Sequence, residues 1–225
     1  FTGKGLAVTV DGNPRYVGLE PYSGSQTAVA EAARNLVAVG AEPLAVTDNL
    51  NFGDPEDEIV YYHLYYAIEG IKDACNALKT PVTGGNVSLY NTKQGITILP
   101  NPVIGMVGLV HDTTRTMTPW FKRAGDRVAL IGRFQPSLGG AEYQRLKAGE
   151  VYGQPPSISL NDEAFLATFV REKLIEQSLV QSVQDVSTGG LLVSLLECLF
   201  ANPNTQETLG LSLNLNELKR QTTLQ

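Results

Sequence analysis

The stretch TPVTGGNVSLYN, at positions 80–91, is the one on which the interpretation of this sequence depends. An apolar, strand-like beginning runs directly into two adjacent glycines, Gly84 and Gly85, and then into a polar series that includes Asn86 and Ser88. Adjacent glycines give up side-chain packing and lose much conformational entropy on folding. An element keeps them where the backbone turns sharply or where another group approaches it closely. The stretch therefore predicts such a turn or close approach.

A second stretch, TDNLNFGDPED at 47–57, has the same layout. It follows the apolar residues LAV and places Asp48, Asn49, Asn51 and Asp54 close to a glycine. In α/β folds the carboxyl ends of strands hold ligands, oxygen-bearing side chains suit magnesium, and backbone N–H groups beside glycine can cradle phosphate. A simpler interpretation stays open for each stretch, namely a helix-capping turn or a β-bulge. Two such stretches after two strands favour a binding site.

Other familiar catalytic signatures are missing from the sequence. It contains no GxxxxGK[ST] or GxGxxG nucleotide motif, no GxSxG elbow, no CxxC pair and no HExxH helix. The two histidines, His63 and His111, have no partner at metal-ligand spacing, so both are interpreted as structural. In QDVSTGG, at 184–190, Asp185 and Ser187 precede a predicted helix and are interpreted as its caps.

Composition excludes several classes of protein. Seventeen basic residues against 23 acidic ones give a net charge of -6 without a basic run, which makes nucleic acid a poor partner. The longest apolar run, Val103 to Val110, is far shorter than the ~20 residues of a membrane-spanning helix. Cys75 and Cys198 each stand alone in a helical pattern, which is typical of buried thiols in a reducing compartment. These features predict a cytoplasmic protein.

Helices and strands alternate along the chain and predict an α/β fold of the α+β type. Amphipathic helices are expected at 26–39 and 59–78, and strands at the GLAVTVDG, LAVT and PVTGG stretches and at 96–110. After a polar stretch the pattern resumes with a strand, RVALIG at 127–132, a helix at 161–178 and another after Gly190. An alternating strand near 211–216 and a short helix after it are also expected. We therefore expect two domains, 1–118 and 119–225. Both chain ends look cut, so a piece of a longer polypeptide is expected.

Six stretches together resemble one known family, phosphoribosylformylglycinamidine synthase, a ligase and amidotransferase of purine biosynthesis. They occur in the family's order over nearly the whole chain and are most similar to the second half of its synthetase subunit: GLAVTVDGNPRYVGLEPYSGSQTAVAEAARNL, PLAVTDNLNFGDPE, TPVTGGNVSLYN, PNPVIGMVGL, GGAEY and QDVSTGGL. The resemblance implies the two-domain fold of aminoimidazole ribonucleotide synthetase, in which an N-terminal domain pairs its sheet with a partner and a C-terminal α/β domain packs beside it. Selenophosphate and thiamine monophosphate enzymes of this fold fit LNFG and GGNVSLYN less well.

The resemblance also implies a reaction. ATP activates the formyl amide oxygen of formylglycinamide ribonucleotide, and ammonia from a glutaminase component displaces phosphate to give the amidine. Transferred by motif, Asp48 and Gly85 bind ATP, Asn86 is a ligand of Mg²⁺, and Ser88 contacts the ribonucleotide substrate.

The sequence also departs from the family pattern. Asn49 and Asp54 stand where Cys and Asn are frequent, and Gln184 stands where His is frequent. Nothing resembles ESHNHP, the stretch that carries the family's catalytic histidines, so no catalytic residue is assigned and the chain alone is expected to be inactive. An alternative, a structural half with a permanent, non-catalytic nucleotide, stays open. The missing partner is the first half of the same enzyme, and the isolated piece is expected to form a homodimer in its place.

Overall fold

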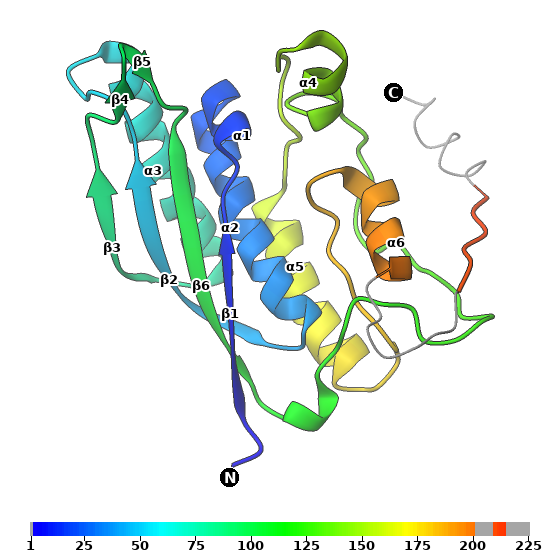
Figure 1. The fold of residues 1–225 in the computed structure, drawn as a ribbon. Helices are drawn as coiled ribbons and strands as arrows, with labels where there is room; N and C mark the ends of the chain where they lie inside the picture. Colours follow the sequence, from blue (N-terminus) through cyan, green and yellow to red (C-terminus); the bar gives the residue numbers. More distant parts are fainter. Residues whose placement is uncertain (1, 201–208, 215–225) are drawn as a thin grey trace.

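A computed structural model describes residues 2–200 and 209–214 of the chain. At its centre is a four-stranded sheet in the order β1 (Gly5–Asp11), β6 (Asn101–Val110), β2 (Glu42–Asn51) and β3 (Val82–Ser88). β6 is antiparallel to both of its neighbours, β1 and β2, whereas β2 and β3 are parallel. The two strands that carry the predicted site residues therefore lie side by side, and β3 forms one edge of the sheet (Figure 1).

Helices cover one face of this sheet (Figure 1). The short α1 (Pro14–Leu19) leads into α2 (Pro21–Ala38), which is rich in alanine. Helix α2 begins with Pro21, and proline is tolerated there because the first N–H groups of a helix have no carbonyl partner within it. α3 (Glu58–Leu78) packs against α2, and the Asp57 carboxylate caps its first turn by accepting from two backbone N–H groups. The helices predicted at 26–39 and 59–78 are confirmed.

The hydrophobic core lies between the sheet and these helices. Along β6, Ile104, Met106 and Val110 are buried and contribute to it, whereas the odd-numbered residues 103–109 face the opposite side of the sheet. Small alanines on α2 let that helix approach the strands closely, so Ala28, Ala32 and Ala33 are almost fully buried. This alternation is what a sheet with one covered face requires.

The opposite face of the sheet, which we call the outer face, is open, and it is apolar along β1 and β6. On β1, Leu6, Val8 and Val10 are 75%, 78% and 72% exposed. They pair in register with Leu109, Val107 and Gly105 of β6, so these side chains form a continuous apolar surface. An apolar sheet face of this kind is a candidate contact surface for another protein.

β2 and β3 are longer than predicted from sequence. Strand β2 continues through Asn51 and β3 runs from Val82 through Ser88, so residues assigned to loops after the strands lie within them. The reason is strand pairing. Strand β6 pairs along the whole of β2, and pairing with β2 in turn keeps β3 extended. The polar segments are therefore held as rigid strand ends.

A small hairpin follows β3, made of β4 (Thr92–Lys93) and β5 (Ile96–Thr97). The stretch predicted as one strand from 96 to 110 is thus two, with β6 beginning at Asn101. A 3₁₀ turn, η1 (Thr113–Arg115), then leaves the sheet and leads into the C-terminal part of the chain.

The described C-terminal part holds helices without a sheet of its own. α4 (Glu142–Ala148), α5 (Leu160–Phe169), a π-helical continuation η2 (Val170–Ile175) and α6 (Gly190–Phe200) are its regular elements. The strand predicted at 127–132 is wrong, because that segment has no strand to pair with among the described residues and is irregular. The strand predicted near 211–216 is not formed at residues 211–214, and the rest of that stretch and the short helix expected after it lie outside the described residues.

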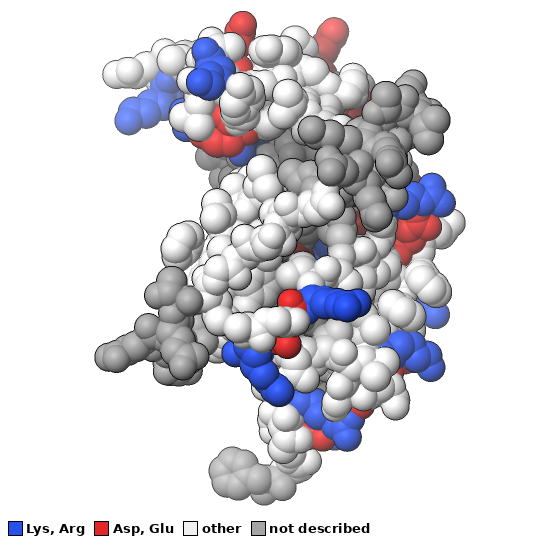
Figure 2. All heavy atoms as spheres, turned by 90° about the vertical axis from the view of Figure 1, so that its right-hand side faces the viewer, with Lys and Arg blue, Asp and Glu red and all other residues white. Residues whose placement is uncertain are grey.

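The C-terminal part packs on the N-terminal part through α5, which contacts both α2 and α3. Arg34 of α2 pairs with Glu163 of α5 at 3.0 Å, and Arg15 of α1 pairs with Glu142 of α4. A groove of about 1640 Å³ remains between the two parts. Figure 2 shows the molecule from the right-hand side of Figure 1, and the middle of that view has few charged side chains.

Two further sequence expectations can be compared with the fold. Cys75 and Cys198 are separate, buried thiols, as predicted. Within residues 2–200 and 209–214, no helix has the length and apolar character needed to cross a membrane.

Candidate functional site

The predicted site residues come together where β2 and β3 run in parallel. Asp48 pairs in register with Gly85, and Asn49 pairs with Asn86. One step further along, Asn51 pairs with Ser88. Two stretches of sequence separated by α3 are thereby brought into direct contact.

The strand alternation divides these residues between the two faces of the sheet. Asp48 lies between the buried Val46 and Leu50 and so faces the helices. Asn49 and its partner Asn86 point to the outer face, where both are exposed. The predicted site residues thus lie on two sides of the sheet at the edge strand β3.

A hydrogen bond joins the two amides on the outer face. Nδ2 of Asn86 donates to Oδ1 of Asn49 at 3.1 Å. This leaves Oδ1 of Asn86 without a donor among the described residues, and it is free to accept from a ligand or bind a cation. The sequence alone offered Asn49 as one of several oxygen-bearing side chains near a glycine and as a departure from the family pattern, and it gave no sign of this pairing.

Ser88 is held by Asn91, which sequence reasoning did not single out. Nδ2 of Asn91 donates to the carbonyl oxygen of Ser88 at 2.9 Å and to that of Phe52 at 3.0 Å, and it lies 3.0 Å from Oγ of Ser88. Between them Tyr90 adopts a left-handed backbone with φ of 59°. Such a conformation in a non-glycine residue indicates a backbone that its surroundings hold firmly. The position of Ser88 is therefore fixed before any ligand binds.

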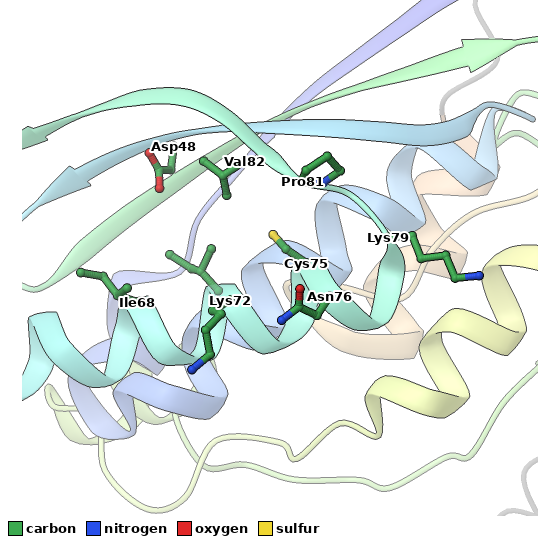
Figure 3. A pocket seen from close by; sticks show the side chains of 9 residues that line it. Asp48, Ile68, Lys72, Cys75, Asn76, Lys79, Pro81 and Val82 are labelled. Atoms are coloured by element: carbon green, nitrogen blue, oxygen red, sulfur yellow. The ribbon is translucent and has the colours of Figure 1, made fainter.

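Asp48 opens into a pocket of about 500 Å³ between α3 and strands β2 and β3. Figure 3 shows Ile68, Cys75 and Val82 around it, with the side chains of Lys72 and Lys79 extending away from Asp48. Burial raises the pKa of the Asp48 carboxyl, and no cation in the described part of the chain offsets this effect. A half-buried carboxylate beside apolar walls suits a ligand that donates hydrogen bonds to that carboxylate.

Gly85 is required by its neighbour on β2. A Cβ atom at this position would lie 1.9 Å from Oδ1 and 2.3 Å from the carbonyl oxygen of Asp48. No side chain fits at that distance, so the close packing of the two strands itself demands glycine. Substitution would displace the carboxylate that faces the pocket.

The donor set at this site fits magnesium only as part of a larger shell. Among the described residues, no group of three or more His, Cys, Asp or Glu side chains could hold a metal ion. Asn86 offers one neutral oxygen, free and exposed at the end of a strand. Mg²⁺ is often bound through few protein ligands, with phosphate oxygens and waters completing its octahedron, and Asn86 suits that mode of binding.

A second group of charged residues, which the sequence did not predict, lies beside the groove between the two parts of the chain. Glu31 and Asp185 both have a raised pKa, mainly because they are buried, and Arg34 partly opposes the shift. Nε of Arg34 and Oδ2 of Asp185 are buried without a hydrogen-bond partner among the described residues. Asp185 was expected to cap α6, which stays a prediction, and the charged side chains that act on its carboxyl are Arg34 of α2 and Asp11 of β1.

Comparisons with known proteins agree on one family. Residues 1–110 match the sequence model of AIR synthase related proteins, N-terminal domain, and residues 123–207 match the corresponding C-terminal domain. The boundary expected after residue 118 falls between these ranges and stays a prediction.

The PurL subunit of phosphoribosylformylglycinamidine synthase from Gloeobacter violaceus is 53% identical over 202 residues, which cover 88% of this chain and 26% of that protein. The PurL subunit from an Anaeromyxobacter species is 49% identical over 196 residues, covering 87% and 25%. The chain thus spans about a quarter of the length of these curated relatives.

A solved structure, T. maritima PurL complexed with AMPPCP, matches with a TM-score of 0.50 and 35% identity. The match covers 53% of this chain and 20% of that one. The resemblance seen in the sequence and the two-domain α/β fold are confirmed by these findings together. The chain belongs to the AIR synthase related family, with the family's N-terminal domain in residues 1–110 and its C-terminal domain in residues 123–207.

Proposed function

We propose that this chain is the ATP-binding and magnesium-binding part of a phosphoribosylformylglycinamidine synthase subunit, which converts formylglycinamide ribonucleotide to the amidine. The observation that carries this proposal is the pairing of the TDNLNFG and TGGNVS strands, which places Asp48, Gly85, Asn86 and Ser88 within one small region. Similarity to PurL subunits over most of the chain supports it. The T. maritima relative binds AMPPCP, a methylene analogue of ATP.

Each residue has a distinct role in this proposal. Asp48 accepts hydrogen bonds from the nucleotide on the helix side of β3, and Gly85 keeps the two strands close enough to hold that carboxylate in place. On the outer face, Oδ1 of Asn86 binds Mg²⁺, which screens phosphate charge when it is bound. Ser88, fixed by Asn91, contacts the ribonucleotide. The chain thus binds and orients both reactants.

The proposed reaction proceeds in two steps. The formyl amide oxygen takes the γ-phosphoryl group and ADP leaves; ammonia then adds to the same carbon, and phosphate departs with that oxygen. A glutaminase component supplies the ammonia. The first half of the enzyme supplies the residues that move protons, since this chain has no stretch like ESHNHP. The chain alone therefore binds reactants without turning them over.

The outer face of the sheet is proposed to meet the first half of the same enzyme. Leu6, Val8 and Val10 form an exposed apolar row, and water contact with that row is unfavourable. In the isolated chain a second copy takes the place of the first half and forms a homodimer. The site residues on the outer face lie on the same surface, so partner contact also closes the site.

A location in the cytoplasm is part of the proposal, supported by the two free thiols at Cys75 and Cys198. The alternative, a permanent structural nucleotide, has no observation in its favour. The Asn86 and Asp48 side chains are partly or fully exposed, which suits a nucleotide that exchanges.

Complementation tests the proposed function. The chain is mixed with a PurL subunit that lacks the matching quarter, and amidine formation from formylglycinamide ribonucleotide, ATP and ammonia is measured. We expect the mixture to be active and each component alone to be inactive. Inactivity of a mixture whose components associate, or activity of the chain alone, would contradict the proposal.

A further inference from the structure

The contact between the two parts of the chain brings several carboxylates together. Asp11 of β1 and Glu31 of α2 belong to the N-terminal part, and Asp185, in the segment before α6, belongs to the C-terminal part. Burial raises the pKa of both Glu31 and Asp185, and the negative charge of Asp11 adds to the rise at each. Like charges from three separate elements thus act on one another at this contact.

Arg34 of α2 is the cation that acts on both Glu31 and Asp185, and it is shared with a third carboxylate. Its Nη1 lies 3.0 Å from Oε2 of Glu163 on α5. Nε of Arg34 and Oδ2 of Asp185 are both buried, and neither has a hydrogen-bond partner among the described residues. One guanidinium therefore leaves the negative charge of this contact only partly compensated.

The other polar groups at the contact are neutral. Nδ2 of Asn35 donates to both carboxylate oxygens of Asp11, at 3.2 and 3.1 Å. Ser187 hydrogen-bonds to Glu31 and Asp185, and Glu31 also acts on the phenol of Tyr16 on α1. These groups supply hydrogen bonds without positive charge. When the carboxylates are ionised, repulsion between them acts in a partly buried region, where charges are poorly screened.

We propose that these carboxylates form a proton-operated latch between the N-terminal and C-terminal parts of the chain. With protons on Glu31 and Asp185 the two parts pack together. With both groups ionised, repulsion across the contact weakens the packing, and the groove that both residues line opens to solvent more often. The latch concerns the packing of the chain and is independent of the proposed reaction.

The direction of the pH effect follows from burial. Glu31 and Asp185 hold their protons more tightly when the parts are packed than when water surrounds the carboxyl groups. Protonation therefore stabilises the packed arrangement below the ordinary carboxyl pKa. This stabilisation is lost as the pH rises through the raised pKa values, so the groove opens more often at neutral and alkaline pH.

Cys198 on α6 reports on this opening, because its thiol is buried and lines the same groove. In the Cys75→Ser chain, the rate at which 4,4′-dithiodipyridine modifies Cys198 is measured from about pH 4.5 to pH 8, a range that spans the titration of buried carboxyl groups. Thiolate formation also speeds the reaction as the pH rises, so each variant is compared with the parent chain at the same pH. The measurement uses no nucleotide, and its result leaves the proposed function untouched.

Replacing both groups, with Glu31→Gln and Asp185→Asn together, should slow the modification of Cys198 at pH 8 by about tenfold for each unit by which burial raises a pKa. The difference from the parent should disappear at the acidic end of the range. Glu150→Gln, an exposed carboxylate outside the groove, is the control and should react as the parent does at every pH.

Equal rates in the double variant and the parent at pH 8 would overturn the latch. A difference of the same size at every pH would also overturn it, because that result indicates changed packing rather than lost charge. The two single variants should each show the same pH dependence with a smaller effect. Removing repulsion should stabilise the packed chain, so a double variant that fails to fold at neutral pH would contradict the inference as well.

Discussion

Nδ2 of Asn86 donates a hydrogen bond to Oδ1 of Asn49 across the two parallel strands of the site, at 3.1 Å. The contact determines which end of the Asn86 amide faces the ligand. An amide that could rotate would present its nitrogen half of the time, and a nitrogen donor repels a cation. Asn49 therefore orients the proposed metal ligand without touching the metal itself.

Removing this hydrogen bond should weaken magnesium binding. Asn49→Leu has a similar volume and no acceptor. We therefore expect that about tenfold more Mg²⁺ is needed to support ATP binding, a typical loss of metal affinity when a residue that orients a metal ligand is removed. Asn49→Asp retains the acceptor and should stay close to the wild type. Calorimetry at a series of Mg²⁺ concentrations measures this, with Thr47→Val on the same strand as the control. Equal Mg²⁺ dependence in the Leu variant would show that Asn86 needs no support.

Asp48 gives a prediction with a defined pH dependence. Burial raises its pKa in the folded state, so the folded protein holds this proton more tightly than the unfolded chain does. The protonated group favours folding below the ordinary aspartate pKa, and this contribution is lost as the pH rises through the raised value. At neutral pH the ionised carboxylate therefore costs stability.

Asp48→Asn should accordingly raise the melting temperature at pH 7, and the gain should disappear toward low pH, where Asp48 is itself neutral. The same variant should bind ATP more weakly, because the carboxylate is the proposed acceptor. Melting curves and titrations over this pH range measure both effects. A variant that is less stable at pH 7 would show that the carboxylate makes contacts that outweigh its burial.

Gly85→Ala should destabilise the fold, in contrast to Gly84→Ala, because a Cβ added at Gly84 would meet no atom within 4 Å. A Cβ would lie 1.9 Å from Oδ1 of Asp48, so the strands must separate or the carboxylate must move. Overpacking of this kind typically costs about 1–3 kcal/mol. Urea unfolding measures the difference. Equal unfolding midpoints for the two alanine variants would mean that the strands are less tightly paired than they appear in the structure.

The contact between α2 and α5 gives another prediction. Arg34 pairs with the largely buried Glu163 at 3.0 Å and also lowers the pKa values of Glu31 and Asp185, against the effect of burial. Arg34→Met keeps most of the side-chain volume and leaves these carboxylates without their cation, which should destabilise the chain by about 1–3 kcal/mol. The loss should be largest at neutral pH and smaller in acid, where the carboxylates are protonated. Urea unfolding at two pH values distinguishes this from a loss of packing, which would not depend on pH.

The apolar outer face predicts self-association of the isolated chain. Val8→Lys places a charge in the middle of the exposed row on β1 and should convert a homodimer to a monomer in light scattering. Ile59→Lys, on α3 and also exposed, is the matched control and should leave the dimer intact. A wild-type chain that is monomeric at micromolar concentration would remove the basis for this prediction.

The sequence predicted the elements better than their extents. Helical periodicity located α2 and α3 correctly, because Ala28, Ala32 and Leu36 recur at the spacing of one buried helix face. The ends of β2 and β3 were missed because Asn, Asp and Gly favour turns locally, and only hydrogen bonding to β6 and β2 holds them extended. The strand expected at 127–132 failed for the opposite reason, since a short apolar run forms no strand without a partner strand.

The site was only partly predictable. Asp48, Asn86 and Ser88 were chosen because polar residues at strand ends bind ligands, and the structure brings their strands together. That Asp48 and Asn86 occupy opposite faces depends on strand register, which the two separate stretches could not reveal. The roles of Asn49 and Asn91 depend on contacts between side chains or with a distant carbonyl, for which a sequence pattern gives no sign.

The most direct test of the central claim is calorimetric titration of the nucleotide-free chain with ATP, with and without Mg²⁺, beside Asn86→Ala. We predict binding that requires Mg²⁺ in the wild type and is lost in the variant, while Asn76→Ala, on α3 in the wall of the Asp48 pocket, keeps its Mg²⁺ dependence. ATP binding that is equally strong without Mg²⁺, or unchanged in Asn86→Ala, would contradict a metal and nucleotide site at the β2 and β3 strands.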